Sequence, residues 1–178
     1  MENFDRFIGV VKKYAEAYRD FEKIQKAPDF DFVPQIGDQK TGIIGESFIF
    51  EYLKRQRYKN IEFGGHSQKG WDKKHSHGLA PNGVVLVQVK TVSAFSKTRS
   101  ISPLHLAPDY CELYLVSLNE ELIPDNIWKP KGYSPAKMKG QVVMGTRMPK
   151  DENDTSSGFT GLENIFEDFK KTFPELYQ

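Results

Sequence analysis

The sequence predicts an α/β domain in which helices flank a mixed central sheet. Helical patterns of apolar residues cover both ends of the chain and residues 38–55, while dense β-branched or apolar runs lie between residues 61 and 118. The chain has 178 residues, 38% hydrophobic and 28% charged, so one domain with a sizeable core is expected. An aromatic share of 13% also favours a packed core over disorder.

Bulk properties exclude several classes of protein. The formal net charge is +1, so any basic surface for nucleic acid must be local. Cys111 is the only cysteine, which excludes an internal disulfide, and its default role is a small buried side chain. No stretch approaches the ~20 apolar residues of a membrane span, and the first residues do not resemble a signal peptide. A cytoplasmic location is therefore expected.

Residues 4–25 are predicted to form an amphipathic helix. Apolar residues recur every three or four positions from Phe4 to Phe21, and charged residues such as Lys12 and Glu16 occupy the other side. Such a helix usually packs against a core, although its aromatic stripe could instead form a dimer contact. The two prolines within residues 27–35 then indicate a connector.

A second helix is predicted over residues 38–55, with Asp38 as its N-cap. At 100° per residue, Glu46 falls between Leu53 and Phe50 on the inward side. An inward carboxylate is costly unless something pairs with it, so Glu46 is a candidate functional residue. The alternative is that Glu46 lies at the edge of the apolar face and reaches solvent. Gly45 would allow a neighbouring element to approach closely.

The central strand is predicted at residues 84–92. Val85, Val87 and Val89 point to one face, and the other face ends in Gln88 and Lys90. So dense an apolar run indicates a strand covered on both sides, where an unpaired lysine would be costly. Gln88 and Lys90 are therefore expected to point into a catalytic cleft. The alternative is a strand that simply runs out into solvent.

A hairpin is predicted to bring an acidic residue to this strand. Residues 61–63 and 71–77 are candidate strands, and the turn-rich residues 78–83 lead directly into the central strand. This arrangement places Asp72 near Lys90.

The rest of the chain supplies further elements. The expected order is a loop or short helix at 91–102, a strand at 113–118, a turn at 119–126, a strand beginning at Ile127, a strand at 141–144 and a linker at 151–158. Thr160-Gly-Leu-Glu163 matches a capping box and predicts a final helix over residues 160–176.

These residues form a possible metal centre. Mg²⁺ prefers oxygen ligands, which the Asp72 carboxylate, the Gln88 amide and the Val89 backbone carbonyl can supply. Glu46 can hold water in the second coordination shell or bind a second ion. Lys90 can orient or help deprotonate an attacking water and can offset charge on a phosphoryl transition state.

The arrangement resembles the PD-(D/E)XK nuclease superfamily, with its restriction endonuclease-like fold. The matching motifs are Gly45-Glu46 on a helix, Gly70-Trp71-Asp72, and Gln88-Val89-Lys90 after an apolar strand, and the resemblance covers residues 38–118. It looks closest to the Mrr-like branch, in which a Gln-X-Lys form also occurs. Trp71 replaces the name-giving proline, and Gln88 replaces an acidic residue.

The resemblance implies a three-layer core and a Mg²⁺-dependent endodeoxyribonuclease, with Mn²⁺ as a possible substitute. It further implies double-stranded DNA as substrate and a role in restriction of foreign DNA, with repair as a lesser alternative. Two-fold DNA sites favour a homodimer by analogy. The Gln88 replacement could instead mark a non-cutting nucleic-acid-binding or assembly protein on the same fold. A third possibility is an interaction protein whose N-terminal helix binds a partner.

Basic residues supply candidate DNA contacts. Residues 126–150 contain no acidic residue and include Trp128 and Tyr133, which makes this stretch a DNA-contact candidate. The alternatives for the residues near Asp72 are an ordinary solvated loop, or a zinc site at His75 and His77. The individual candidates are Lys69, Lys73, Lys74, His75, His77, Lys97, Arg99, Lys129 and Lys131.

Overall fold

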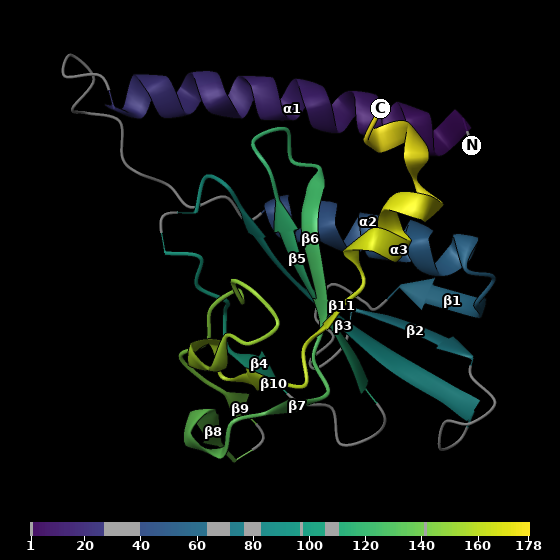
Figure 1. The fold of residues 1–178 in the computed structure, drawn as a ribbon. Coiled ribbons are helices and arrows are strands. Elements are labelled where there is room, and N and C mark those ends of the chain that lie inside the picture. The colour runs from purple at the N-terminus through teal and green to yellow at the C-terminus, as the bar shows by residue number, and fades with distance from the viewer. Residues whose placement is uncertain are drawn as a thin grey trace.

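A mixed sheet forms the centre of the protein (Figure 1). The computed structural model describes residues 2–26, 40–63, 72–76, 83–96, 98–105, 111–140 and 142–178. Within these residues the sheet has the order β1-β2-β3-β5-β6-β11, in which β3 and β5 pair in parallel and all other neighbours are antiparallel. Its strands are β1 (Lys59–Phe63), β2 (Lys73–Ser76), β3 (Val84–Ser93), β5 (Cys111–Leu118), β6 (Pro124–Lys129) and β11 (Glu163–Asn164).

The long strand β3 confirms the predicted central strand and extends slightly beyond it. It pairs with β5 from Leu86 opposite Cys111 to Ser93 opposite Leu118. Val92 and Ser93 are only 3% and 5% exposed, because the parallel partner continues to this point. The loop predicted at 91–102 therefore begins only after Ser93.

The predicted hairpin before β3 is also present. Lys73 lies opposite Val87 and Ser76 opposite Val84, and β1 adds a further antiparallel strand. The strand predicted at 61–63 is confirmed as part of β1. The strand predicted at 71–77 is confirmed over Lys73–Ser76, whereas Asp72 lies in a bend before it. The hairpin fixes the level of Asp72 along β3.

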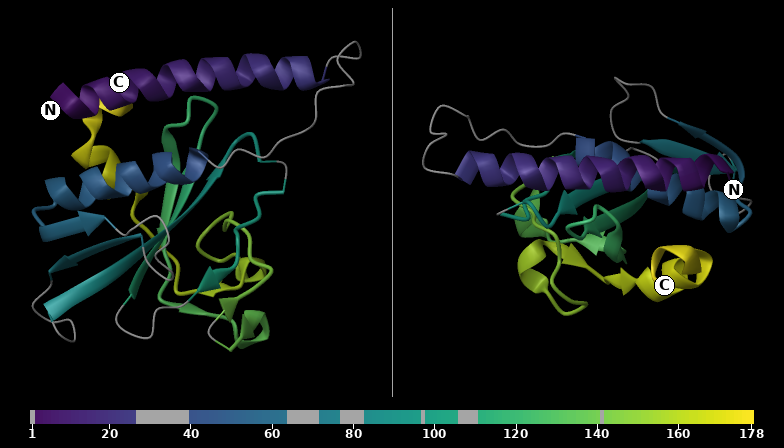
Figure 2. Two further views of the ribbon diagram at one scale, coloured as in Figure 1. Left: turned by 180° about the vertical axis from the view of Figure 1, so that it is seen from behind. Right: turned by 90° about the horizontal axis from the view of Figure 1, so that it is seen from above.

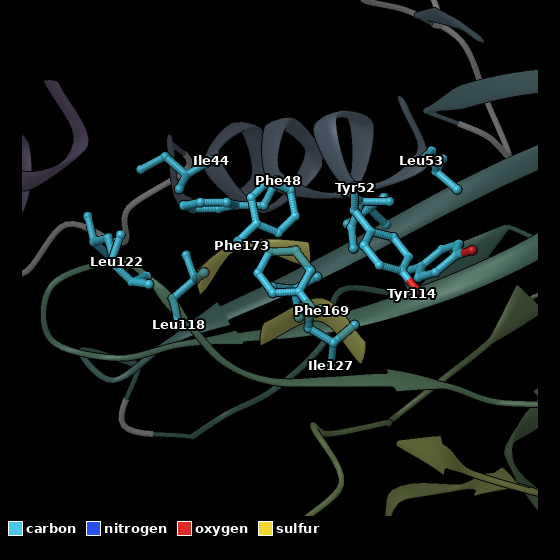
Figure 3. Packing of buried hydrophobic residues seen from close by; sticks show 14 of the residues in the cluster. Ile44, Phe48, Tyr52, Leu53, Tyr114, Leu118, Leu122, Ile127, Phe169 and Phe173 are labelled. Atoms are coloured by element: carbon cyan, nitrogen blue, oxygen red, sulfur yellow. The ribbon is translucent and has the colours of Figure 1, made fainter. Parts of the chain in front are cut away.

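Helix α2 (Lys40–Arg55) covers one face of the sheet. Its residues Phe48, Ile49 and Leu53 are fully buried in one core cluster with Val85, Val87 and Val89. Figure 3 shows the aromatic centre of this cluster, where Phe48 and Tyr52 of α2 meet Phe169 and Phe173 of the C-terminal segment. The helix predicted at 38–55 is confirmed over its described part, and the proposed cap Asp38 lies outside the described residues.

Helix α1 (Glu2–Lys26) forms an outer layer above α2 (Figures 1 and 2). Ring contacts attach it near both of its ends. The Phe4 ring lies 5.3 Å from that of Phe173, and the Tyr18 ring lies 4.5 Å from that of Phe95. The predicted helix at 4–25 is therefore confirmed, and its core-packing interpretation applies to one side of the helix.

The prediction of one helix over residues 160–176 is wrong in its first half. The chain forms β10 (Phe159–Thr160), β11, α3 (Phe166–Thr172) and the 3₁₀ turn η5 (Pro174–Leu176). Glu163 and Asn164 pair with β6 instead of opening a helix, and the Asn164 side chain accepts a hydrogen bond from the Phe166 amide at 2.9 Å. Tertiary strand pairing thus overrides the local capping-box pattern.

Short strands and loops cover the other face of the sheet. They are β4 (Leu104–His105), β7 (Gly132–Tyr133), η3 (Pro135–Lys137), β8 (Met138–Lys139), β9 (Val142–Val143), η4 (Thr155–Ser157) and β10. A second core cluster joins Leu113, Leu115 and Trp128 of the sheet to this layer. The α-helices of the described residues contribute only to the first cluster, so the expected helices flank one face. Among the described residues, no helix is both long and apolar enough to cross a bilayer.

The contact between α2 and β3 generates a stability prediction. A Cβ atom at Gly45 would lie 2.0 Å from Thr91 Oγ1, whereas one at Gly42 would meet nothing within 4 Å. We expect Gly45→Ala to lower the free energy of unfolding by about 1–3 kcal/mol through overpacking. Gly42→Ala, the matched control, should raise it by about 0.5–1 kcal/mol through helix propensity.

Urea unfolding measures both effects. The double variant Gly45→Ala/Thr91→Ala should lose less free energy of unfolding than the sum of the two single losses, because the threonine branch that clashes with the new methyl group is removed. Equal effects of the Gly45 and Gly42 substitutions would contradict the close approach of α2 to β3.

Candidate functional site

Asp72 is held against the middle of β3 by two hydrogen bonds. Its backbone amide donates to the Val87 carbonyl at 2.8 Å, and its Oδ2 accepts from the Val89 amide at 2.7 Å. The carboxylate thus takes the place of a backbone carbonyl, because β2 begins only at Lys73. Beyond Val87, no described strand pairs with this side of β3. We call this side of residues 88–93 the open edge of β3.

Gln88 and Lys90 point away from α2. Val85, Val87 and Val89 belong to the cluster under α2, so the alternating residues Gln88 and Lys90 lie on the opposite face. Gln88 is 6% exposed and lies opposite Leu113. Lys90 is half-buried, and its Nζ donates to Ser102 Oγ at 3.2 Å. The ammonium is therefore restrained by the loop that follows β3.

The Val89 carbonyl adds a potential oxygen ligand at the open edge of β3. The N–H and C=O groups of one strand residue point toward the same neighbouring strand, so this carbonyl faces the side on which Asp72 lies. Asp72, which directly precedes β2, thus lies beside the backbone of Gln88 and Val89 on β3, as expected from the hairpin.

The predicted metal ligands nevertheless carry little negative charge. Asp72 is the only carboxylate among these three predicted ligands. No group of three or more His, Cys, Asp or Glu side chains in the described parts of the chain could hold a metal ion. One carboxylate with an amide and a carbonyl suits a hard cation such as Mg²⁺ in ligand type, but it would bind the ion weakly.

Glu46 comes from a different layer. It follows Gly45, whose Cα faces the Thr91 side chain, and it is half-buried. Thr91 succeeds Lys90 on β3 but points toward α2, so Glu46 lies at the level of Lys90 and in the helical layer. Of the residues expected to meet in one cleft, Asp72 lies beside the segment that carries Gln88 and Lys90. Glu46 belongs to the helical layer, so it could reach these residues only around the open edge of β3.

Most of the predicted DNA contacts that the structure describes have intramolecular partners. Lys74 pairs with Glu62 at 2.9 Å, and Lys129 pairs with Glu112 at 2.8 Å. His75 is 1% exposed, so it does not belong to an exposed basic rim. Lys69, His77, Lys97 and the Lys73 side chain lie outside the described residues.

The basic stretch at 126–150 is also partly internal. Trp128 is 1% exposed in the second core cluster, so it cannot stack on bases. Tyr133 packs on Phe159 with 6.0 Å between ring centroids. The exposed basic residues among the described DNA-contact candidates and in this stretch are Arg99, Lys131, Lys139 and Lys150.

Sequence reasoning missed a buried polar group around Glu112 on the α2 face of the sheet. Glu112 Oε1 lies 2.8 Å from Lys129 Nζ, Oε2 accepts from the Tyr114 hydroxyl at 2.9 Å, and Oε2 lies 3.9 Å from His75 Nε2. The His75 ring also packs on Tyr58, 4.5 Å away. The available signal was Glu112 at an inward position of an otherwise apolar strand, two residues before Tyr114.

The partners of Glu112 keep it ionised. Burial acts to raise the pKa of Glu112, but hydrogen bonds from His75, Lys129 and Tyr114, together with the charge of Lys129, outweigh burial and lower the pKa to about 2. Burial and the adjacent carboxylate raise the pKa of Tyr114, which therefore remains a hydrogen-bond donor. This group links β2, β5 and β6 and is a structural network.

No protein-family model matches this chain, and a comparison with curated proteins finds no match. The functional argument therefore depends on the chemistry and geometry of the residues at β3.

The Glu112 network generates a prediction about acid stability. The pKa of Glu112 in the folded protein lies below its ordinary value of 4.5, so its contribution to stability is present above pH 4.5 and is lost as the pH falls to about 2. Over this range the native protein should lose about 3 kcal/mol that the Glu112→Gln variant does not lose.

Urea unfolding across this pH range measures the difference. Glu121→Gln, which changes an exposed carboxylate, is the matched control and should follow the native protein. Parallel pH profiles for the native protein and Glu112→Gln would contradict the proposed network.

Proposed function

We propose that the protein is a metal-dependent DNA endonuclease that hydrolyses phosphodiester bonds at the open edge of β3 and acts in restriction of foreign DNA. The observation that carries this proposal is the 2.7 Å hydrogen bond between Asp72 Oδ2 and the Val89 amide. It holds a carboxylate at the edge of β3, against the backbone of the strand that also carries Gln88 and Lys90. The resemblance to the PD-(D/E)XK nuclease superfamily supports the same assignment.

Each residue of the group has a chemical role in this proposal. Asp72, Gln88 and Val89 would hold Mg²⁺, or Mn²⁺ in its place, and the ion would supply positive charge against the phosphate. Lys90 orients the attacking water and stabilises negative charge that develops on the phosphate oxygens. Ser102 restrains the Lys90 ammonium. Glu46 contributes only if its carboxylate reaches around the open edge of β3.

DNA would reach the open edge of β3 through local positive charge. Arg99, Lys131, Lys139 and Lys150 are exposed, whereas Lys129 is neutralised by Glu112. Since each basic contact to a phosphate releases counterions, binding should weaken as the salt concentration rises.

A second candidate function is non-catalytic DNA binding on the same fold. Two observations favour it. Because Gln88 is neutral, Asp72 is the one carboxylate among the predicted ligands Asp72, Gln88 and Val89. Its Oδ2 already accepts a hydrogen bond from the Val89 amide. A site of this kind could retain its shape after losing its metal.

The role of Asp72 can be tested without removing its structural hydrogen bond. In Asp72→Asn the side-chain carbonyl can still accept from the Val89 amide, but the negative charge is lost. We expect Mg²⁺-dependent nicking or cutting of plasmid DNA to fall by about 100-fold or more with an unchanged melting temperature. Asp125→Asn, at an exposed aspartate of β6, is the matched control. Cutting that persists in EDTA or in Asp72→Asn would exclude the proposed mechanism.

Gln88→Glu tests whether the site is limited by its missing charge. The substitution adds a second carboxylate beside Asp72, so Mg²⁺ should bind more tightly, and cutting at low Mg²⁺ should rise by about 10-fold. Isothermal titration with Mg²⁺ and plasmid cleavage measure the two effects. If DNA binding persists while neither the native protein nor Gln88→Glu cuts, the non-catalytic function is the correct one.

A further inference from the structure

Helix α1 carries two apolar stripes, and only one of them is fully buried in the core. The core-facing stripe includes Phe4, Val11 and Ala15, which are at most 8% exposed. We call the second set the outer stripe. Its members follow one another at intervals of three and four residues and are Phe7, Val10, Tyr14, Ala17 and Phe21. This spacing is the heptad pattern by which one helix packs against another.

The outer stripe remains accessible in the folded chain. Val10 is 60% exposed and Phe21 is 45% exposed, and Ala17 between them is also exposed. Phe7 and Tyr14 are half-buried and pack against the core cluster, with the Phe7 ring 5.6 Å from that of Phe48, so the exposed part of the outer stripe is Val10, Ala17 and Phe21. Exposed large apolar side chains in heptad register along one helix indicate an interaction surface. Figures 1 and 2 show α1 as the outermost helix, so a second helix could lie along it.

The charges beside the outer stripe indicate which partner fits. Arg6, Lys13 and Asp20 are exposed and follow at intervals of seven residues along one rim. The rim carries both signs, which does not suit an anionic lipid surface. Arg6 and Asp20 lie at equal separations from Lys13, so the rim is complementary to a reversed copy of itself.

We propose that the chain self-associates through α1, with the outer stripes of two copies packed antiparallel about a two-fold axis near Lys13. In this arrangement Arg6 of each copy faces Asp20 of the other, which gives two favourable contacts against one like-charge contact between the two Lys13 residues at the axis. A parallel arrangement would lack this match, because the residues on the other side of the outer stripe pack into their own core.

The interface is short, and the expected affinity follows from its length. Residues 7–21 of a helix span about 21 Å, so a dissociation constant on the order of 10 µM is reasonable. Sedimentation of the full chain should show a concentration-dependent rise from 20.4 kDa toward twice that mass. A monomer at all concentrations up to about 200 µM would overturn the proposal.

Apolar substitutions test the outer stripe. Val10→Asp and Phe21→Asp change exposed side chains, so the fold should survive while the dissociation constant rises by about 10-fold or more. Met144→Asp, at another exposed apolar residue, is the matched control and should leave the mass distribution unchanged. Circular dichroism and the melting temperature verify folding. Dimers that persist in both outer-stripe variants would place the interface elsewhere.

A charge-exchange cycle tests the antiparallel arrangement. Arg6→Asp or Asp20→Arg alone should weaken the dimer by juxtaposing like charges, and the double variant should restore it. Asp20 also pairs with Lys23 at 2.9 Å, but both side chains are highly exposed, so loss of this pair should have little effect. Lys12→Asp, off both stripes, is the control. Failure of the double variant to recover, or binding of anionic vesicles by a chain that stays monomeric, would overturn the proposal.

Discussion

The hydrogen bond from the Val89 amide to the Asp72 carboxylate determines how β2, β3 and the candidate site fit together. β3 continues past the start of β2, so among the described strands none pairs with its next amide on that side. An unpaired buried amide would cost about 1–3 kcal/mol. Asp72 satisfies the amide with a side chain, and a negatively charged group is thereby fixed beside a backbone carbonyl. One local solution to a hydrogen-bonding problem thus produces the only acidic position at the open edge of β3 that the described residues show.

Alternation along β3 separates two kinds of polar chemistry. On the α2 face, Glu112 pairs with Lys129 and lies 3.9 Å from His75 Nε2 in a largely buried network. Gln88 and Lys90 lie on the other face of the sheet, which the layer of short strands covers. Loss of one partner from a largely desolvated ion pair is strongly destabilising, which favours a structural role for the first group. In the second group the Lys90 ammonium donates to the neutral Ser102 hydroxyl.

The sequence predicted the elements whose signals are local. The dense valines of residues 84–92, the heptad-like spacing of residues 4–25 and the turn before Val84 all led to the correct helix or strand. The errors depended on long-range pairing. Glu163 and Asn164 are strand residues because β6 lies beside them, and Trp128 is buried because the short strands cover it. At the candidate site, the hairpin correctly predicted that Asp72 would approach β3. A helical wheel could place Glu46 inward, but it could not show which face of the sheet α2 would cover.

The burial of Gln88 explains why a neutral side chain is suitable at this position. Gln88 is 6% exposed, and a carboxylate there would lose most of its hydration. An amide carries a much smaller desolvation penalty, so the strand folds without requiring an ion as counter-charge. Metal affinity at the proposed site must then come from Asp72 and backbone oxygen, and it must be modest. A neutral Gln88 at the proposed site would therefore make catalysis depend strongly on the concentration of the ion.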